Sequence, residues 1–283
     1  MALKDILVQV DDGRGHQARL ALAAAIAART EAHLTGLFVI EPISFSALAA
    51  PGGSDFAAAE AFQVVEREHR AARLKLGERL AALFRDAADR AGVNSEWRIA
   101  DDDAATAMVL HARYADLAVL GQADPDNPPL GAGAVEAVLL GSGRPALVVP
   151  FIGAESVGRR VLVAWNATRE AARAVNDALP LLIQAETVTV LSVNPERGIG
   201  GDGELPAADI ALHLARHGVK AEAAHTTAEA VSVGDIILSR AADLGADLIV
   251  MGGYGHSRAR EFVLGGATRT LLRHMTVPVL LSH

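Results

Sequence analysis

A glycine-rich segment near the end of the chain contains the residues whose types and spacing best fit a chemical task. Two residues separate Gly252 from Gly255, and nine more separate Gly255 from Gly265. Gly266 and Thr268 follow directly, at the start of an expected helix. Glycine lets backbone N–H groups approach a ligand closely, and a helix N-terminus adds free N–H groups and a favourable dipole. The segment therefore predicts a cradle for phosphate.

The same glycines have a plainer interpretation, in which they only form tight turns and cap a helix. Two glycine clusters placed after an apolar run and before a helical stretch favour the phosphate site. Four basic residues add positive charge to the segment: Arg258, Arg260, Arg269 and Arg273. The spacing fits neither G-x-G-x-x-G nor G-x-x-x-x-G-K-[ST], so dinucleotide binding of the usual kind and P-loop hydrolysis are not indicated.

The remaining candidate residues form no convincing catalytic or metal-binding set. His213 and His217 lie four residues apart on an expected helix, but no third ligand accompanies them, which favours surface helix residues. The run Asp101 to Asp103 precedes a helical stretch, where acidic side chains stabilise a helix N-terminus. The chain has no cysteine, which excludes thiol nucleophiles and Cys-based zinc sites. We therefore predict no catalytic and no metal-ligating residues.

The elements that position the glycine segment follow from the hydrophobic pattern. Five strand-like runs are expected in the second half of the chain, at 161–165, 187–193, 221–225, 247–252 and 278–282. Helix-compatible stretches lie between them, at 170–183, 207–217, 233–242 and 267–274. This alternation predicts a doubly wound α/β fold with a parallel sheet. Ligands bind such sheets beyond the carboxyl ends of the strands, and the glycine segment follows the fourth strand.

The first half of the chain repeats the second. Three segments return in the same order: ADLAVLG (115–121) as ADLIVMG (246–252), DILVQVDD (5–12) as RVLVAWNA (160–167), and RPALVVP (144–150) as VPVLLSH (277–283). Such ordered matches indicate a tandem duplication. We predict two domains, at 1–150 and 158–283, each a five-stranded parallel sheet with helices on both faces. The first domain also has an expected loop at 50–55 and a long charged helix at about 57–91.

Length and composition narrow the class of protein. The 283 residues suggest about two domains at ~150 residues each. A net charge of -8 argues against nonspecific nucleic-acid binding and against a polybasic membrane anchor. No apolar segment reaches the ~18 residues of a membrane span, and the opening MALKDILVQV lacks the pattern of a signal peptide. We therefore expect a cytoplasmic protein with no nucleic-acid and no membrane partner.

With these features the chain resembles a tandem universal stress protein. ATP-binding members of that family carry Gly-x2-Gly-x9-Gly-Ser/Thr after the fourth strand, and Gly252, Gly255 and Gly265 match its three glycines. Gly266 stands where Ser or Thr is usual, which removes one phosphate-binding hydroxyl that Thr268 could replace. The resemblance covers nearly the whole chain. It implies that the second domain binds ATP or ADP, with or without Mg²⁺.

The resemblance also implies which residues surround the nucleoside. Asn166 holds the position of an Asp that contacts the nucleoside in ATP-binding members, and Ala164 would line the adenine side. Val193 matches a Val that holds adenine through its backbone. Each residue also has a plain alternative. Ala164 and Val193 could be ordinary core residues, and Asn166 could serve a turn or a helix start.

The first half departs from the family pattern. Asp11 and Val39 match the strand-one Asp and strand-two Val, and Gly121 keeps the first glycine. Gly121 is followed by Gln-Ala-Asp124, however, and Asp124 and Asp126 would repel phosphate. Three prolines in the same segment remove backbone donors. We predict a degenerate nucleotide site in this half, with Asp11, Val39 and Gly121 forming a pocket for a nucleoside or another small ligand.

Three functions stay open at this stage. The favoured one is a stress-response protein that binds ATP or ADP and changes its conformation or partners with the nucleotide. The alternatives are a slow ATPase, for which no base is evident, and a nucleotide-free interaction protein. The resemblance also implies that 146–149 and 279–282 pair within one chain as a pseudo-dimer, and that two chains associate as a homodimer. Apolar edge strands need such cover.

Overall fold

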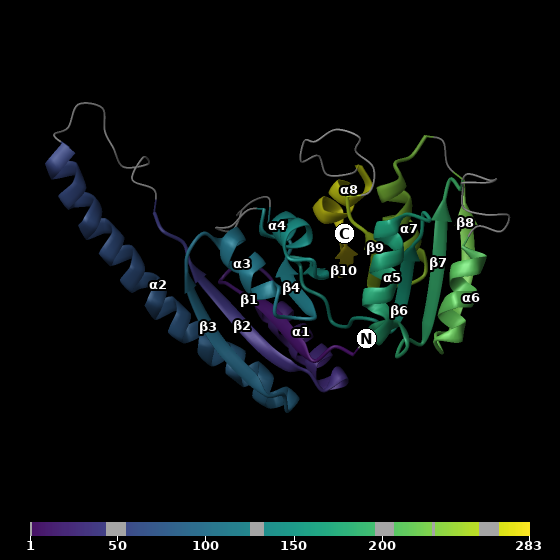
Figure 1. Cartoon of the computed structure of the whole chain (residues 1–283), viewed down its shortest axis with the longest axis horizontal. Helices are drawn as coiled ribbons and strands as arrows, with labels where there is room; N and C mark the ends of the chain where they lie inside the picture. The colour runs from purple at the N-terminus through teal and green to yellow at the C-terminus, as the bar shows by residue number, and fades with distance from the viewer. Residues whose placement is uncertain (1, 44–54, 125–132, 196–206, 228–229, 255–265) are drawn as a thin grey trace.

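A computed structural model of the chain describes residues 2–43, 55–124, 133–195, 207–227, 230–254 and 266–283 (Figure 1). The first half contains β1 (Asp5–Val10), α1 (His16–Thr30), β2 (His33–Ile40), α2 (Asp55–Ala91), β3 (Ser95–Asp101), α3 (Ala104–Ala112), β4 (Leu117–Gly121), α4 (Ala134–Gly141) and β5 (Ala146–Val149). The second half contains β6 (Arg160–Ala164), α5 (Arg169–Leu182), β7 (Thr187–Val193), α6 (Ala208–Arg216), β8 (Ala221–Thr226), α7 (Val233–Asp243), β9 (Leu248–Gly252), α8 (Gly266–His274) and β10 (Val279–Ser282). The expected alternation of strands and helices is confirmed.

The strands form one ten-stranded sheet in the order β3-β2-β1-β4-β5-β10-β9-β6-β7-β8. All pairs within each half are parallel, whereas β5 and β10 pair antiparallel, with Val148 opposite Val279. The two halves are thus doubly wound five-stranded sheets that share a seam, which is the strand pairing that the family resemblance implied. In each half the winding reverses between the first and fourth strands, at β1 and β4 and at β6 and β9.

Helices cover both faces of the sheet, and each face has its own apolar cluster. One cluster packs α1, α2, α5 and α6 against the sheet, and the other packs α3, α4, α7 and α8. The central strands β4 and β9 are apolar and buried almost throughout because both of their faces are covered. The fold class predicted from the sequence is therefore confirmed.

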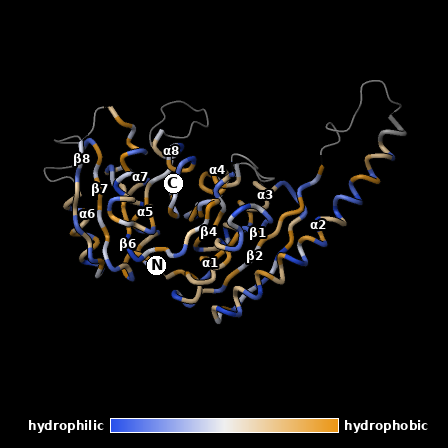
Figure 2. The backbone as a smooth tube through the Cα atoms, turned by 180° about the vertical axis from the view of Figure 1, so that it is seen from behind, coloured by the Kyte–Doolittle hydropathy of each residue, from blue (hydrophilic) through white to orange (hydrophobic). Residues whose placement is uncertain are grey.

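The long helix α2 begins two residues earlier than expected and reaches beyond the sheet (Figure 1). Its C-terminal part is anchored by Leu80, Phe84 and Ala88, whose side chains are buried. Most side chains from 59 to 72 are exposed, and the alternation of hydrophilic and hydrophobic residues along the helix is visible in Figure 2. None of the described helices combines the length and apolarity that crossing a bilayer requires.

Polar caps set the starts of three helices. Asp103 precedes α3 and accepts a hydrogen bond from the Thr106 backbone N–H at 2.9 Å, which explains the acidic run seen in the sequence. Thr168 and Ser232 cap α5 and α7 in the same way. Thr168 and Ser232 thereby place α5 and α7 within one residue of the ranges expected from periodicity.

Candidate functional site

The carboxyl ends of β6, β7 and β9 meet at the point where the second half reverses its winding. Ala164, the last residue of β6, pairs with Leu191 of β7 and with Met251 of β9. The next residue, Trp165, donates its backbone N–H to the Leu191 carbonyl at 2.9 Å. The segments that follow these strands are therefore held at one edge of the sheet, where ligands of doubly wound folds bind.

A pocket of about 80 Å³ opens at this edge. It is lined by Ala164, Trp165, Asn166, Leu191, Val193, Val233, Ile237, Met251, Gly252 and Ala267. Four of the residues predicted from the sequence therefore surround one cavity, although they come from three strands. Gly266 and Thr268 flank the lining residue Ala267 in the first turn of α8. Gly255 and Gly265 lie outside the described residues, so the structure shows only the two ends of the motif, Gly252 and Gly266.

The first turn of α8 is held firmly but leaves room beside Gly266. A Cβ on Gly266 would meet no atom of the described residues within 4 Å. Thr268 is buried, and Gly234 of α7 allows the two helices to pack closely, since a Cβ there would lie 2.6 Å from the Thr270 Cβ. The helix start is thus fixed against α7, and no described atom crowds its first residue.

Gly252 has a packing role that the motif did not reveal. A Cβ at this position would lie 2.5 Å from the Ala171 backbone nitrogen and 2.6 Å from the Glu170 carbonyl carbon. Only glycine lets the N-terminus of α5 sit this close to the end of β9. The residue therefore shapes the pocket edge independently of any ligand.

Asn166 organises the entry into α5. Its Oδ1 accepts a hydrogen bond from the Thr168 hydroxyl at 2.9 Å, and the Thr168 Oγ1 accepts one from the Ala171 backbone N–H at 3.3 Å. The helix-entry interpretation of Asn166 is therefore confirmed. The residue is exposed and also lines the pocket, so its amide nitrogen remains available to a ligand.

Two ionisable groups close to the pocket are displaced from their usual pKa. Burial opposes ionisation of the Glu170 carboxyl, but hydrogen bonds from its own backbone N–H, Arg169 and Thr168 outweigh it and lower the pKa of Glu170. Burial, assisted by the negative charge of Glu136, raises the pKa of Tyr254 far above its usual range. The Tyr254 hydroxyl is buried and has no hydrogen-bond partner among the described residues. Near the pocket, Glu170 is therefore anionic and Tyr254 neutral at physiological pH.

Sequence reasoning missed several lining residues. Val233 and Ile237 lie four residues apart on α7 and present one apolar face to the pocket. That spacing was visible in the sequence, but nothing local showed that α7 crosses this strand edge. Trp165 lies between Ala164 and Asn166, and because side chains alternate along a strand, its position favours the face of the sheet away from the pocket. It does pack against the cluster formed by α1, α2, α5 and α6, but it also lines the pocket.

The corresponding region of the first half is occupied by the side chain of Arg19. Its guanidinium lies 2.7 Å from the Asp11 carboxylate, and its Nε donates to the Gln9 carbonyl at 2.9 Å. Arg19 is only 4% exposed. A Cβ on Gly121 would collide with this guanidinium, so glycine is required here by Arg19.

A second arginine reaches the same region from α2. Arg73 lies over the Phe38 ring at 4.8 Å and donates an Nη2 hydrogen bond to the Val39 carbonyl at 3.5 Å. Asp11, Val39 and Arg73 line a residual cavity of about 30 Å³. The three residues predicted to form a pocket in the first half are thus each in contact with an arginine of the chain itself.

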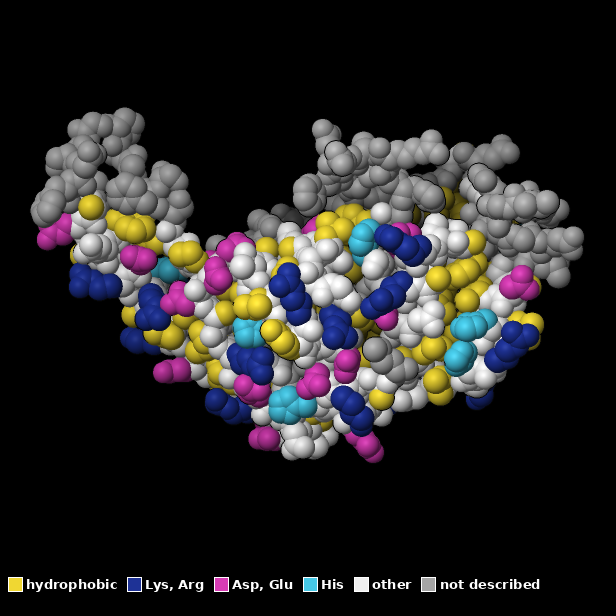
Figure 3. All heavy atoms as spheres, in the orientation of Figure 1, with side chains coloured by type: hydrophobic (Ala, Val, Ile, Leu, Met, Phe, Trp, Pro, Cys, Tyr) yellow, Lys and Arg dark blue, Asp and Glu magenta, His cyan; other side chains and the backbone are white. Residues whose placement is uncertain are grey.

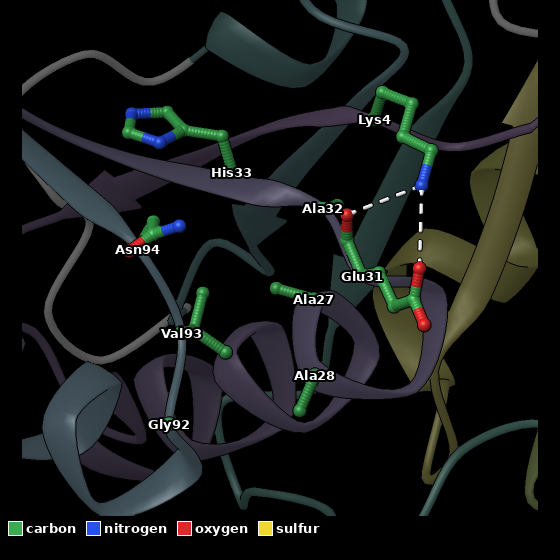
Figure 4. Close-up of a pocket in the computed structure, with 9 residues that line it drawn as sticks. All are labelled: Lys4, Ala27, Ala28, Glu31, Ala32, His33, Gly92, Val93 and Asn94. Carbon is green, nitrogen blue, oxygen red and sulfur yellow. Dashed lines mark hydrogen bonds and ion pairs between the residues drawn. The ribbon is translucent and has the colours of Figure 1, made fainter.

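A larger hollow of about 410 Å³ lies near the amino ends of β1 and β2 (Figure 4). It opens between the C-terminal ends of α1 and α2, where β2 begins. Lys4 lies on one side of it and bonds to Glu31, through the backbone carbonyl at 3.3 Å and the carboxylate at 3.8 Å. Because doubly wound folds bind ligands at the carboxyl ends of their strands, we place the candidate site at the smaller pocket.

Surface charges do not single out another site on the face shown in Figure 3. Basic and acidic side chains are interspersed there. Elsewhere on the described surface, exposed charges also pair, as Arg70 does with Asp101 at 2.7 Å. The described residues contain no group of three or more His, Cys, Asp or Glu side chains arranged to hold a metal ion.

Comparisons with known proteins agree with this architecture. A family model described as the universal stress protein family matches residues 158–283. The crystal structure of a universal stress protein from Archaeoglobus fulgidus DSM 4304 superposes with a TM-score of 0.71 at 17% identity, covering 98% of this chain and 97% of that chain. A functionally unknown protein from Pseudomonas aeruginosa PAO1 gives a TM-score of 0.58 at 17% identity, with 99% and 92% covered. No curated protein sequence matches the chain.

The two kinds of comparison complement one another. The sequence match covers the half that contains the glycine motif, and the solved structures show that the fold extends over both halves. The resemblance inferred from the motif and the repeats is therefore confirmed. Residues 158–283 thus carry a universal stress protein domain, and the first half of the chain repeats the fold of that domain.

Proposed function

We propose that the second half of this chain binds ATP or ADP, and that the protein acts as a nucleotide-dependent regulatory protein in the stress response. One observation carries the proposal. The strand-end residues Ala164, Asn166, Val193 and Gly252 line one pocket at the switch point, together with Ala267 from the first turn of α8. This arrangement matches the sites implied for ATP-binding members of the family.

The pocket has an apolar side and a side suited to anions. Ala164, Val193, Ile237 and Met251 offer apolar surface to an adenine ring. The phosphates would then lie toward the start of α8, where free backbone N–H groups and the helix dipole favour negative charge. Thr268 is the candidate hydroxyl there in place of the usual Ser or Thr. We assign no side chain to Mg²⁺, which the phosphate oxygens would hold.

The first half would not take part in nucleotide binding. Its Asp11 carboxylate is paired with Arg19, and its Val39 carbonyl accepts a hydrogen bond from Arg73. A nucleoside would have to displace both arginines, one of which is buried. The proposal therefore assigns one nucleotide to each chain.

A nucleotide-free interaction protein is the second candidate. It is favoured by the structural roles of Gly252, which makes room for α5, and of Asn166, which supports the start of that helix. Both residues would be needed without any ligand. The distinguishing residue is Gly266, beside which no described atom explains the glycine.

Substitution of Gly266 tests the proposal directly. Because a Cβ would meet no described atom within 4 Å, Gly266→Ala should keep ADP affinity within about two-fold in a calorimetric titration. Gly266→Asp places its Cβ in the same space, but it adds a carboxylate that would repel the phosphates. It should therefore weaken ADP binding at least about ten-fold. Gly266→Ser should strengthen it a few-fold, roughly the effect of one added hydrogen bond. Equal affinities for the Ala and Asp variants would overturn the proposed site.

A further inference from the structure

We infer that Gln122, which belongs to the first half, positions α8 and thereby sets the phosphate affinity of the pocket in the second half. The inference rests on the proposed function. It goes beyond that function by making a residue of the nucleotide-free half a positioning residue for the site.

Gln122 is a buried amide whose hydrogen bonds cross between the halves. Its Nε2 donates to the carbonyl of Leu272 at 2.9 Å and to that of Arg273 at 3.3 Å, both in the last turn of α8. Its Oε1 accepts from the Phe151 backbone N–H at 3.1 Å. The side chain is thus fixed by Phe151, two residues beyond β5, while it caps the C-terminus of α8.

The contact of Gln122 with α8 has no counterpart between Gly253 and α4. Gln122 follows Gly121 at the end of β4, just as Gly253 follows Gly252 at the end of β9. Gly253 has no side chain to cap α4, and α4 is instead capped by its own Ser142, whose hydroxyl donates to the Val138 carbonyl at 2.6 Å. The first half thus carries Gln122 where the second half has Gly253, and this side chain contacts the other half.

The short helix α8 connects the Gln122 contact at its C-terminus with the proposed site at its first turn. The helix has nine residues, which corresponds to a length of about 13 Å. Its last carbonyls are held by Gln122, its middle by the close contact of Thr270 with Gly234, and its first turn borders the pocket. Helix ends fray when their free carbonyls lack partners, and fraying of a nine-residue helix extends to its other end.

The resulting prediction separates phosphate from nucleoside binding. Gln122→Met keeps the length of the side chain but removes both donors and the acceptor. ADP affinity should fall about five-fold, the effect of losing one ordinary hydrogen bond, because α8 is less well ordered. Adenosine affinity should stay unchanged, because the nucleoside would contact the strand ends and α7. Amide hydrogen exchange of α8 in the nucleotide-free protein should become faster.

Ser142→Ala provides the matched control. It removes the equivalent cap of α4 and should leave ADP affinity, adenosine affinity and α8 exchange as in the wild type. The inference is overturned if Gln122→Met leaves ADP affinity unchanged, whether or not α8 exchange becomes faster, or if ADP and adenosine affinities fall equally. Failure of the wild-type protein to bind ADP would defeat the proposed function itself, and the two failures are thereby distinguished.

Discussion

At the scale of single residues, Arg19 decides which half of the molecule keeps a pocket. The two halves have the same fold, but in the first a guanidinium lies where β1 and β4 end, whereas in the second the described residues leave a pocket where β6 and β9 end. The sequence predicted a degenerate site here from Asp124, Asp126 and nearby prolines, of which Asp126 and the prolines lie outside the described residues. Arg19 itself was not predicted, because no local pattern shows that a residue on α1 meets Asp11 and Gly121 in space.

The ion pair of Arg19 and Asp11 predicts a large loss of stability on substitution. Arg19→Met should lower the free energy of unfolding by about 3 kcal/mol, because it leaves a partly buried carboxylate without its partner. Urea denaturation measures the change. Arg70→Ala, which breaks an exposed pair with Asp101, is the control and should cost less than about 1 kcal/mol. Similar losses for the two variants would contradict the claim that the Arg19–Asp11 pair stabilises the fold more than an exposed pair does.

At the scale of elements, the pocket depends on how closely a helix approaches a strand end. The ranges of α5, α7 and β9 were predictable to within two residues, because amphipathic and fully buried patterns are local properties of the chain. The packing of α5 on Gly252 was not predictable, because phosphate binding already accounted for a glycine at this position of the motif. The contact of Gln122 with Leu272 joins residues 150 positions apart and left no sequence signal.

Gly252→Ala tests the close approach of α5. The new Cβ would force the α5 N-terminus away from β9, and we expect a loss of about 1–3 kcal/mol in the free energy of unfolding. Gly253→Ala is the adjacent control, because its Cβ would find its nearest neighbour at 3.7 Å. Its stability should be unchanged or slightly higher in the same denaturation assay. If Gly252→Ala were as harmless as Gly253→Ala, the packing role of Gly252 would be refuted.

At the scale of the whole molecule, the seam between β5 and β10 makes one sheet from two repeats. The antiparallel pairs Leu147 with Leu280 and Val148 with Val279 lie in its buried centre. The tandem repeat was readable from the sequence, but this pairing followed only from the family resemblance. We expect the two halves to unfold together, because neither edge strand of the seam would otherwise be covered.

Each half carries one tryptophan that reports on its unfolding. Trp97 packs on Phe84 in the first half, with ring centroids 5.7 Å apart, and Trp165 lines the pocket in the second. In Trp97→Phe and Trp165→Phe variants, the fluorescence of the remaining tryptophan should give coincident denaturation midpoints. Leu280→Ala, added to either variant, should lower the free energy of unfolding by about 2–5 kcal/mol, and both midpoints should fall together. Separate midpoints would mean that the halves fold independently.

The central claim is that one half binds a nucleotide and the other is closed by its own arginines. A calorimetric titration of the wild-type chain with ADP tests this most directly, because it counts sites. The account predicts one site per chain. Two sites per chain, or no binding at millimolar ADP, would contradict it.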